Sequence, residues 1–142
     1  MEKEETLKVL LVKPGEVAKV VEMEDSLEAM QELVGGWIES YIPYNDDVAF
    51  VCNDEGKMQG LPLNRAIRDK NGEIIDIICG DFFVCYAPVD SENFYSLPDD
   101  LMEKYEKQFK NPEDFFRTPD GKGFIAIPYE PGERMVINFD ER

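Results

Sequence analysis

The stretch Trp37-Ile-Glu-Ser-Tyr-Ile42, followed after a turn by Val48-Ala-Phe-Val-Cys52, decides the fold class of this sequence. The second run is apolar throughout, which is typical of a central strand that is buried on both faces. The first run mixes apolar and polar residues as strands do, and Pro43-Tyr-Asn-Asp-Asp47 between the runs is typical of a turn. We therefore expect the two runs to be strands that pair with each other.

A helix is predicted immediately before these strands. Its apolar residues recur at helical spacing: Leu27, Met30, Leu33 and Val34. Asp25 is placed to cap the N-terminus, with Glu28 three residues later as the second half of a capping box. Gly35 and Gly36 supply a stop signal, because glycine readily adopts the left-handed conformation that ends a helix. The sequence thus predicts one helix between residues 25 and 36.

Two hairpins and a further strand are predicted on either side of this unit. Residues 7–13 and 17–22 are expected to open the chain as a β-hairpin around Pro14-Gly15-Glu16. Lys70-Asn71-Gly72 is a tight-turn signal between residues 66–68 and 73–75. Residues 82–86 are expected to form a last buried strand. Residues 60–65, Gly-Leu-Pro-Leu-Asn-Arg, predict an irregular segment or a single helical turn.

The character of the chain changes at Ser96, which is placed to cap a second helix with Asp99 at its third position. Apolar residues step by four along one face of this helix: Leu97, Leu101, Tyr105 and Phe109. We expect that face to pack on the sheet, and the alternative is that it binds a partner. Asn111-Pro112 ends the helix, and a final hairpin is predicted from residues 124–127 and 135–139.

Together these elements predict an α+β protein: a small mixed or antiparallel sheet with one or two covering helices and a C-terminal helix-hairpin extension. The chain has 142 residues, of which 43% are hydrophobic, enough for one sizeable core. We expect a single domain over residues 1–142, in which residues 7–89 form the core and residues 90–142 pack on it as the extension.

The balance of charge limits the partners of this protein. The chain carries 15 basic and 31 acidic residues, a net charge of −16. Such a field repels phosphate backbones and anionic lipid headgroups, so we expect no direct nucleic-acid binding and no membrane binding. It attracts basic protein surfaces. The alternative is that the acidic surface serves solubility alone.

Catalytic and metal-binding side chains are scarce. The chain has no histidine, which excludes the common zinc signatures and the Ser-His-Asp and Cys-His arrangements. Its three cysteines, Cys52, Cys79 and Cys85, lie in apolar surroundings and are expected to be buried free thiols. We therefore predict no catalytic residue, no metal site and no cofactor. A charged N-terminus and the absence of a long apolar run predict a cytoplasmic protein.

One short segment reverses the sign of the charge. Residues 1–56 carry 4 basic and 14 acidic residues, and residues 71–142 carry 7 and 16, whereas residues 57–70 carry 4 and 1. Asn64, Arg65 and Arg68 in this segment are the candidate ligand-binding residues, because a guanidinium on an irregular loop suits a carboxylate or phosphate. The alternative is that these cations bind acidic side chains of the same fold.

The single tryptophan, Trp37, has two interpretations. A lone tryptophan that begins a strand after a helix is expected in the core. Together with Tyr41 and Tyr44 it would otherwise form an exposed recognition patch.

The first two thirds of the chain, about residues 7–86, resemble a bacterial and phage family known as domain of unknown function 3846. Three stretches carry the resemblance: Leu7-Lys-Val-Leu-Leu-Val-Lys-Pro-Gly15, Ser26-Leu-Glu-Ala-Met-Gln-Glu-Leu-Val-Gly-Gly-Trp-Ile-Glu39, and Val48-Ala-Phe-Val-Cys-Asn-Asp-Glu-Gly56 with Gly60-Leu-Pro-Leu-Asn-Arg65 through to Phe83. The resemblance implies a setting among accessory proteins of phages, plasmids and integrated elements, and it implies no mechanism.

Two functional hypotheses follow. The first is a non-enzymatic interaction module whose carboxylates imitate DNA phosphates and bind a basic host or element-encoded protein. The second is a small domain, binding or catalytic, that takes an anionic ligand at Asn64 and Arg65.

Overall fold

The protein is described by a computed structural model over residues 5–131. Strands and helices follow one another along the chain in this order: β1 (Thr6–Val12), β2 (Lys19–Glu24), α1 (Leu27–Val34), β3 (Ile38–Tyr41), β4 (Val48–Asn53), β5 (Leu63–Arg68), β6 (Ile74–Cys79), β7 (Phe82–Tyr86), α2 (Asp99–Phe109), β8 (Glu113–Arg117) and β9 (Phe124–Pro128). Within these residues, no helix is long and apolar enough to cross a membrane.

A five-stranded antiparallel sheet forms the centre of the molecule, with the strand order β2-β1-β7-β4-β3. The predicted pairing of the two deciding runs is confirmed, because β3 and β4 are hydrogen-bonded neighbours in which Tyr41 lies opposite Phe50. The predicted opening hairpin is confirmed as β1 and β2. The α+β class is therefore confirmed, with antiparallel strands and two helices.

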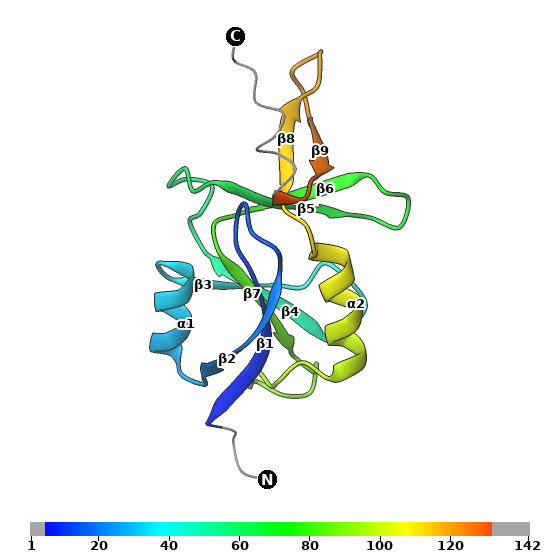
Figure 1. The fold of residues 1–142 in the computed structure, drawn as a ribbon. Helices are drawn as coiled ribbons and strands as arrows, with labels where there is room; N and C mark the ends of the chain where they lie inside the picture. The colour runs from blue at the N-terminus through cyan, green and yellow to red at the C-terminus, as the bar shows by residue number, and fades with distance from the viewer. Residues whose placement is uncertain (1–4, 132–142) are drawn as a thin grey trace.

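The two helices cover opposite faces of this sheet (Figure 1). Side chains alternate along each central strand, so that Val48 and Phe50 of β4 pack in the cluster with α2, whereas Ala49 and Val51 pack in the cluster with α1. All of these side chains are fully buried. Both clusters are apolar, which explains why β4 and β7 read as continuous apolar runs in the sequence.

The cap of helix α1 lies one residue later than predicted. Ser26, and not Asp25, caps it, because the Ser26 hydroxyl accepts the backbone N–H of Ala29 at 3.1 Å. The predicted glycine stop is confirmed: Gly35 has φ 81° and its N–H donates to the carbonyl of Gln31.

The helix α2 begins at Asp99 with Pro98 in the cap position, so the prediction of Ser96 as the cap is wrong. The Ser96 hydroxyl instead accepts the backbone N–H of Lys8 in β1 at 2.9 Å, which ties the segment before α2 to the sheet. The expected packing of the helix on the sheet is confirmed, because Tyr105 and Phe109 are buried against the sheet.

Two short hairpins lie at one end of the sheet (Figure 1). The turn around residues 70–72 is confirmed, since β5 pairs with β6. The prediction that residues 60–65 are irregular is wrong from Leu63 onward, where β5 begins. The predicted strand at residues 124–127 is confirmed as β9, which pairs with β8, and its pairing with residues 135–139 stays a prediction. Residues 135–139 lie outside the described residues.

The prediction that Trp37 is buried is wrong, because its side chain is 70% exposed. Ile38 takes the place next to α1 in the sheet, and the Trp37 backbone carbonyl accepts the N–H of Asp54 at 2.8 Å. The three cysteines are buried free thiols, as predicted.

Candidate functional site

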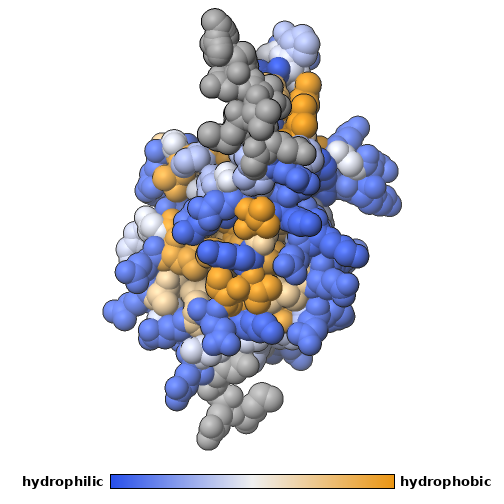
Figure 2. All heavy atoms as spheres, viewed as in Figure 1, coloured by the Kyte–Doolittle hydropathy of each residue, from blue (hydrophilic) through white to orange (hydrophobic). Residues whose placement is uncertain are grey.

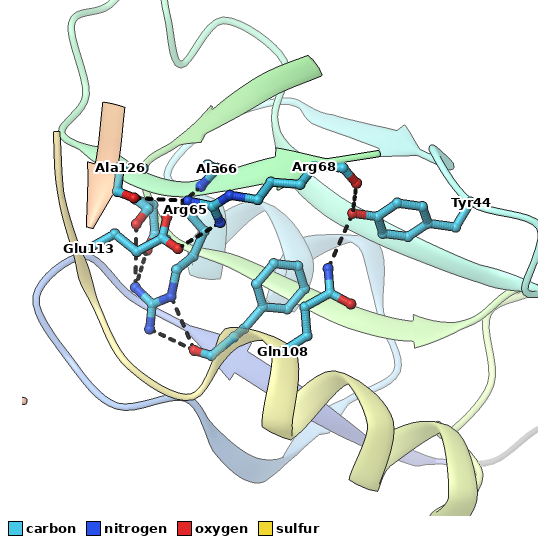
Figure 3. A network of polar contacts seen from close by, with 9 residues as sticks. Tyr44, Arg65, Ala66, Arg68, Gln108, Glu113 and Ala126 are labelled. Carbon is cyan, nitrogen blue, oxygen red and sulfur yellow. Dashed lines mark hydrogen bonds and ion pairs between the residues drawn. The ribbon is translucent and has the colours of Figure 1, made fainter. Parts of the chain in front are cut away.

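Two of the three predicted ligand-binding residues belong to the interior of the protein. Asn64 and Arg65 lie in β5 and are 1% and 0% exposed. The Arg65 guanidinium donates to the Phe109 carbonyl through Nε at 3.1 Å and Nη2 at 2.9 Å (Figure 3). Nη2 also donates to the carbonyl of Glu16 at 2.7 Å, and Nη1 to Oδ1 of Asn64 at 2.9 Å. Arg65 therefore joins β5 to the β1–β2 turn and to the C-terminal end of α2.

Asn64 extends this arrangement toward the central sheet. Its Nδ2 donates to the carbonyl of Val12 at 3.0 Å and to that of Gly80 at 2.7 Å. Burial lowers the pKa of Arg65 to about 10, so the guanidinium is still protonated at neutral pH. The carbonyl at the end of a helix carries partial negative charge, which suits a cation in that place.

Arg68 has a different environment, since its side chain is 33% exposed. Nη1 donates to Oε2 of Glu113 at 3.1 Å, and Nη2 donates to the carbonyl of Ala126 at 3.0 Å. The other carboxylate oxygen of Glu113 accepts the backbone N–H of Ala66 at 2.9 Å. Arg68 and Glu113 thus bind the β8–β9 hairpin to β5 (Figure 3).

These contacts place Asn64 and Arg65 side by side but direct Arg68 elsewhere. They agree with the alternative that these cations bind groups of the same fold. Arg68 binds a carboxylate, as that alternative expects, whereas most acceptors of Arg65 are backbone carbonyls. Anion binding by the three residues stays a prediction, and Arg68 borders two open grooves. The sequence did not indicate the role of Glu113, because its partners Ala66 and Arg68 lie far away along the chain.

The first groove at Arg68, which we call the polar groove, has a volume of about 520 Å³ and lies between the β5–β6 turn and α2. Its cations are Arg68, Lys70 and Lys104. Asp46 in its wall accepts hydrogen bonds from Nζ of Lys104 at 2.6 Å and from the hydroxyl of Tyr105 at 2.8 Å. These two hydrogen bonds, the first from Lys104, hold the pKa of Asp46 below its ordinary value.

The floor of the polar groove is held by a short chain of hydrogen bonds. Nε2 of Gln108 donates to the Tyr44 hydroxyl at 3.1 Å, and that hydroxyl donates to the backbone carbonyl of Arg68 at 2.9 Å (Figure 3). The chain connects α2 to β5, so the shape of this groove depends on contacts that also hold the fold.

The second groove, which we call the apolar groove, has a volume of about 770 Å³. It lies between the β5–β6 and β8–β9 hairpins, and most of its lining is apolar: Leu63, Ile74, Ile75, Ile77, Cys79, Phe124, Ile125 and Ala126. The sequence carries no signal for this groove, because an alternating run such as Phe124-Ile-Ala-Ile-Pro128 does not reveal which face is covered.

A third feature is a long segment without cations, which we call the acidic segment. Residues 20–56 contain ten Asp or Glu residues and no Lys or Arg. Exposed carboxylates occur on β2, α1, β3 and the loop after β4: Glu22, Glu24, Glu28, Glu32, Glu39, Asp54 and Glu55. Exposed apolar side chains lie among them, Leu27 at 56% and Trp37 at 70%.

Family comparison agrees with the resemblance seen in the sequence and extends it. A family model described as a domain of unknown function, DUF3846, matches residues 7–110. The chain belongs to the DUF3846 family. No curated protein and no solved structure matches it.

The DUF3846 match reaches through α2, beyond the residue 86 at which the resemblance read from the sequence ended. Asn64, Arg65 and Phe109 all lie inside the matched residues, whereas β8 and β9 lie outside them. The Arg65 contacts thus belong to the DUF3846 region, and both the Arg68–Glu113 ion pair and the apolar groove join that region to the hairpin that follows it.

Proposed function

We propose that this chain is a non-enzymatic interaction module that binds a basic surface of another protein through its acidic segment. The main observation in support is that residues 20–56 contain ten acidic residues and no lysine or arginine, in a chain of net charge −16. Seven of these carboxylates are exposed on β2, α1, β3 and the loop after β4. Lys8 lies opposite Glu22 and Lys57 follows the segment, but the acids outnumber these cations, and their net negative field attracts a basic partner.

Trp37 supports binding over a purely solubilising role for the acids. Tryptophan is enriched among the residues that dominate binding energy at protein interfaces. Its ring, 70% exposed within the acidic segment, also suits a partner lysine or arginine by cation–π attraction.

The reactive side chains that the chain does contain are poorly placed for catalysis. Burial raises the pKa of Cys52 to about 12, and burial raises the pKa of Cys85 as well, so both thiols are protonated at neutral pH. The guanidinium of Arg65 is committed to backbone carbonyls. These observations favour a binding role.

A DNA-mimic version of this function fits the setting that the family resemblance implies. In such a mimic, exposed carboxylates occupy the groove in which a basic protein holds DNA phosphates. The test is a competition experiment: fluorescence anisotropy of labelled duplex DNA bound to each of a panel of basic DNA-binding proteins, titrated with this chain at low salt. We expect release of the DNA from at least one panel member. No release across the panel removes the mimic version.

A matched pair of variants makes the competition specific. Replacing Glu22, Glu28, Glu32 and Glu39 by glutamine removes four exposed charges of the acidic segment. The control replaces Asp99 and Asp100 by asparagine and Glu103 and Glu106 by glutamine, which removes four charges from α2. We expect weaker release with the first variant than with the control, and equal weakening in the two would assign the effect to net charge alone.

A second candidate function, binding of a small anionic molecule, is favoured by the polar groove. Arg68, Lys70 and Lys104 line it together, and the ammonium group of Lys70 forms no ion pair within residues 5–131. A thermal-shift screen with nucleotides and phosphorylated metabolites tests this candidate, since a ligand that binds the folded state raises the melting temperature. A shift that Lys70→Ala abolishes and Lys122→Ala leaves intact supports it. No shift with any compound contradicts it.

A further inference from the structure

The apolar groove is bordered on one side by β6. Ile75, Ile77 and Cys79 of this strand line the groove, whereas Ile78 packs in the core with α2, and of the three lining residues Ile77 and Cys79 are buried. Ile75 is 53% exposed, although isoleucine is usually buried in a sheet. The β8–β9 hairpin therefore leaves part of this apolar lining open.

The other border is the outer edge of β9. The bonds Thr118 N–H to Gly123 carbonyl and Tyr129 N–H to Pro112 carbonyl fix the alternation of the β8–β9 ladder. By that alternation, Phe124 and Ala126 direct their backbone groups away from β8. The Ala126 carbonyl on this edge accepts Nη2 of Arg68, which itself lines the groove.

Unused backbone groups remain on this edge. Within residues 5–131, the N–H groups of Phe124 and Ala126 and the carbonyl of Phe124 have no hydrogen-bond partner. Pro128 further along has no N–H to offer. The edge of β9 is thus a short template for one further strand, beside a groove that takes apolar side chains.

We propose that the apolar groove binds an extended apolar segment of a partner protein, which adds as a strand to the outer edge of β9. Strand addition supplies main-chain hydrogen bonds to Phe124 and Ala126, and alternate side chains of the segment enter the groove beside Ile75 and Ile77. This inference rests on the proposed function in one respect, namely that the molecule acts as a binding module, and it names a surface that the acidic segment does not include.

Charge indicates which segment fits. Two cations and one acid of the lining are already paired, Lys57 with Asp76 at 2.5 Å and Arg68 with Glu113 at 3.1 Å. The carboxylate of Glu73, which also lines the groove, forms no ion pair within the described residues. A lysine or arginine next to the apolar residues of the segment therefore has a partner at Glu73, and the net charge of −16 attracts such a segment.

A second copy of this chain fits the groove less well. Each copy carries −16, so two copies repel each other. The strands of the hairpin are five residues long, which gives an interface far smaller than the roughly 800 Å² per partner of a stable complex. A small apolar molecule would leave the N–H groups of Phe124 and Ala126 without acceptors, which is costly when they are covered.

The test uses a phage-displayed library of random dodecamer peptides, selected on the purified full chain. We expect enriched peptides with alternating apolar residues next to a lysine or arginine. Fluorescence anisotropy with the synthetic peptides should give at least about tenfold weaker binding to Ile75→Asp. Phe116→Asp is the matched control, because Phe116 is 52% exposed and does not line the groove. No enrichment, or equal loss in the two variants, overturns the proposal.

Backbone methylation separates strand addition from side-chain docking. Peptides with N-methyl groups on alternate residues lose the amide N–H on one edge only. We expect one methylated series to lose binding and the other to retain it. Equal binding by both series overturns strand addition. DNA release by the acidic segment is read out independently, so a failed peptide selection with successful DNA release removes this inference and leaves the proposed function standing.

Discussion

The guanidinium of Arg65 in β5 binds the carbonyl oxygen of Phe109, the last residue of α2, through two of its nitrogens. No carboxylate lies within ion-pair distance of this buried cation in the described residues. Five oxygen acceptors surround it, four of them main-chain carbonyls. The residue that the sequence offered as a ligand-binding group therefore holds helix, turn and strand together.

Replacement of Arg65 is expected to destabilise the whole fold. Arg65→Ala leaves the buried carbonyl of Phe109 without its two donors and removes the part-buried bond to Glu16, and we expect a loss of about 3 kcal/mol in the free energy of unfolding. Urea denaturation followed by circular dichroism measures it. Lys122→Ala, at an exposed turn, is the control and should change stability by less than about 0.5 kcal/mol. An Arg65→Ala protein as stable as the control would show that these bonds are not needed.

Glu113 is expected to hold the β8–β9 hairpin without being essential for the rest of the fold. Glu113→Ala removes the acceptor for the Ala66 N–H and the partner of Arg68. Hydrogen exchange should become faster in β8 and β9, while β4 and β7 keep their protection. Unchanged exchange in the hairpin would mean that other contacts hold it in place.

Acid should act on the contact between Asp46 and α2. The pKa of Asp46 is lowered in the folded state by hydrogen bonds from Lys104 and Tyr105. A carboxylate whose pKa is lowered by folding stabilises the protein above its unfolded value of about 4, and this stabilisation is lost as the pH falls through the lowered folded value. The melting temperature of Asp46→Asn should therefore fall less than that of the wild type between neutral pH and about pH 2. Parallel curves for the two proteins would contradict this assignment.

The thiols should be unreactive in the folded protein. Cys85 is fully buried between the sheet and α1, and burial raises its pKa. We expect Ellman's reagent to label Cys85 only after denaturant is added. Mass spectrometry of the labelled peptide identifies the cysteine that has reacted. Rapid labelling of Cys85 without denaturant would indicate that the α1 side of the sheet opens.

The parts of this fold that could be predicted are those decided by local pattern. Val48-Ala-Phe-Val-Cys52 is a buried strand because no polar residue interrupts it, and the helix before it ends at Gly35 because glycine permits the required conformation. Arg65 could not be placed in this way. A charged residue after Pro62 reads as part of a loop, and its acceptors come from residues far apart along the chain.

The same limit applies to the surfaces. Trp37 and Ile38 are adjacent, so their side chains point to opposite faces of the strand. The sequence does not show which of the two faces the core. The strand β8 was not predicted from the sequence, and its Phe115 and Phe116 lie opposite Ala126 and Ile125 of β9. The apolar groove needs two hairpins to be placed in space before it exists at all.

The salt dependence of binding tests the central claim most directly. The experiment uses a DNA-binding protein that releases its DNA in the competition experiment. Its affinity for the wild-type chain and for the variant with glutamine at residues 22, 28, 32 and 39 is measured by anisotropy over a range of salt concentrations. We predict weaker binding of the variant at low salt and convergence of the two affinities as salt screens the charges. Equal affinities at every salt concentration would contradict the claim that the acidic segment binds the partner.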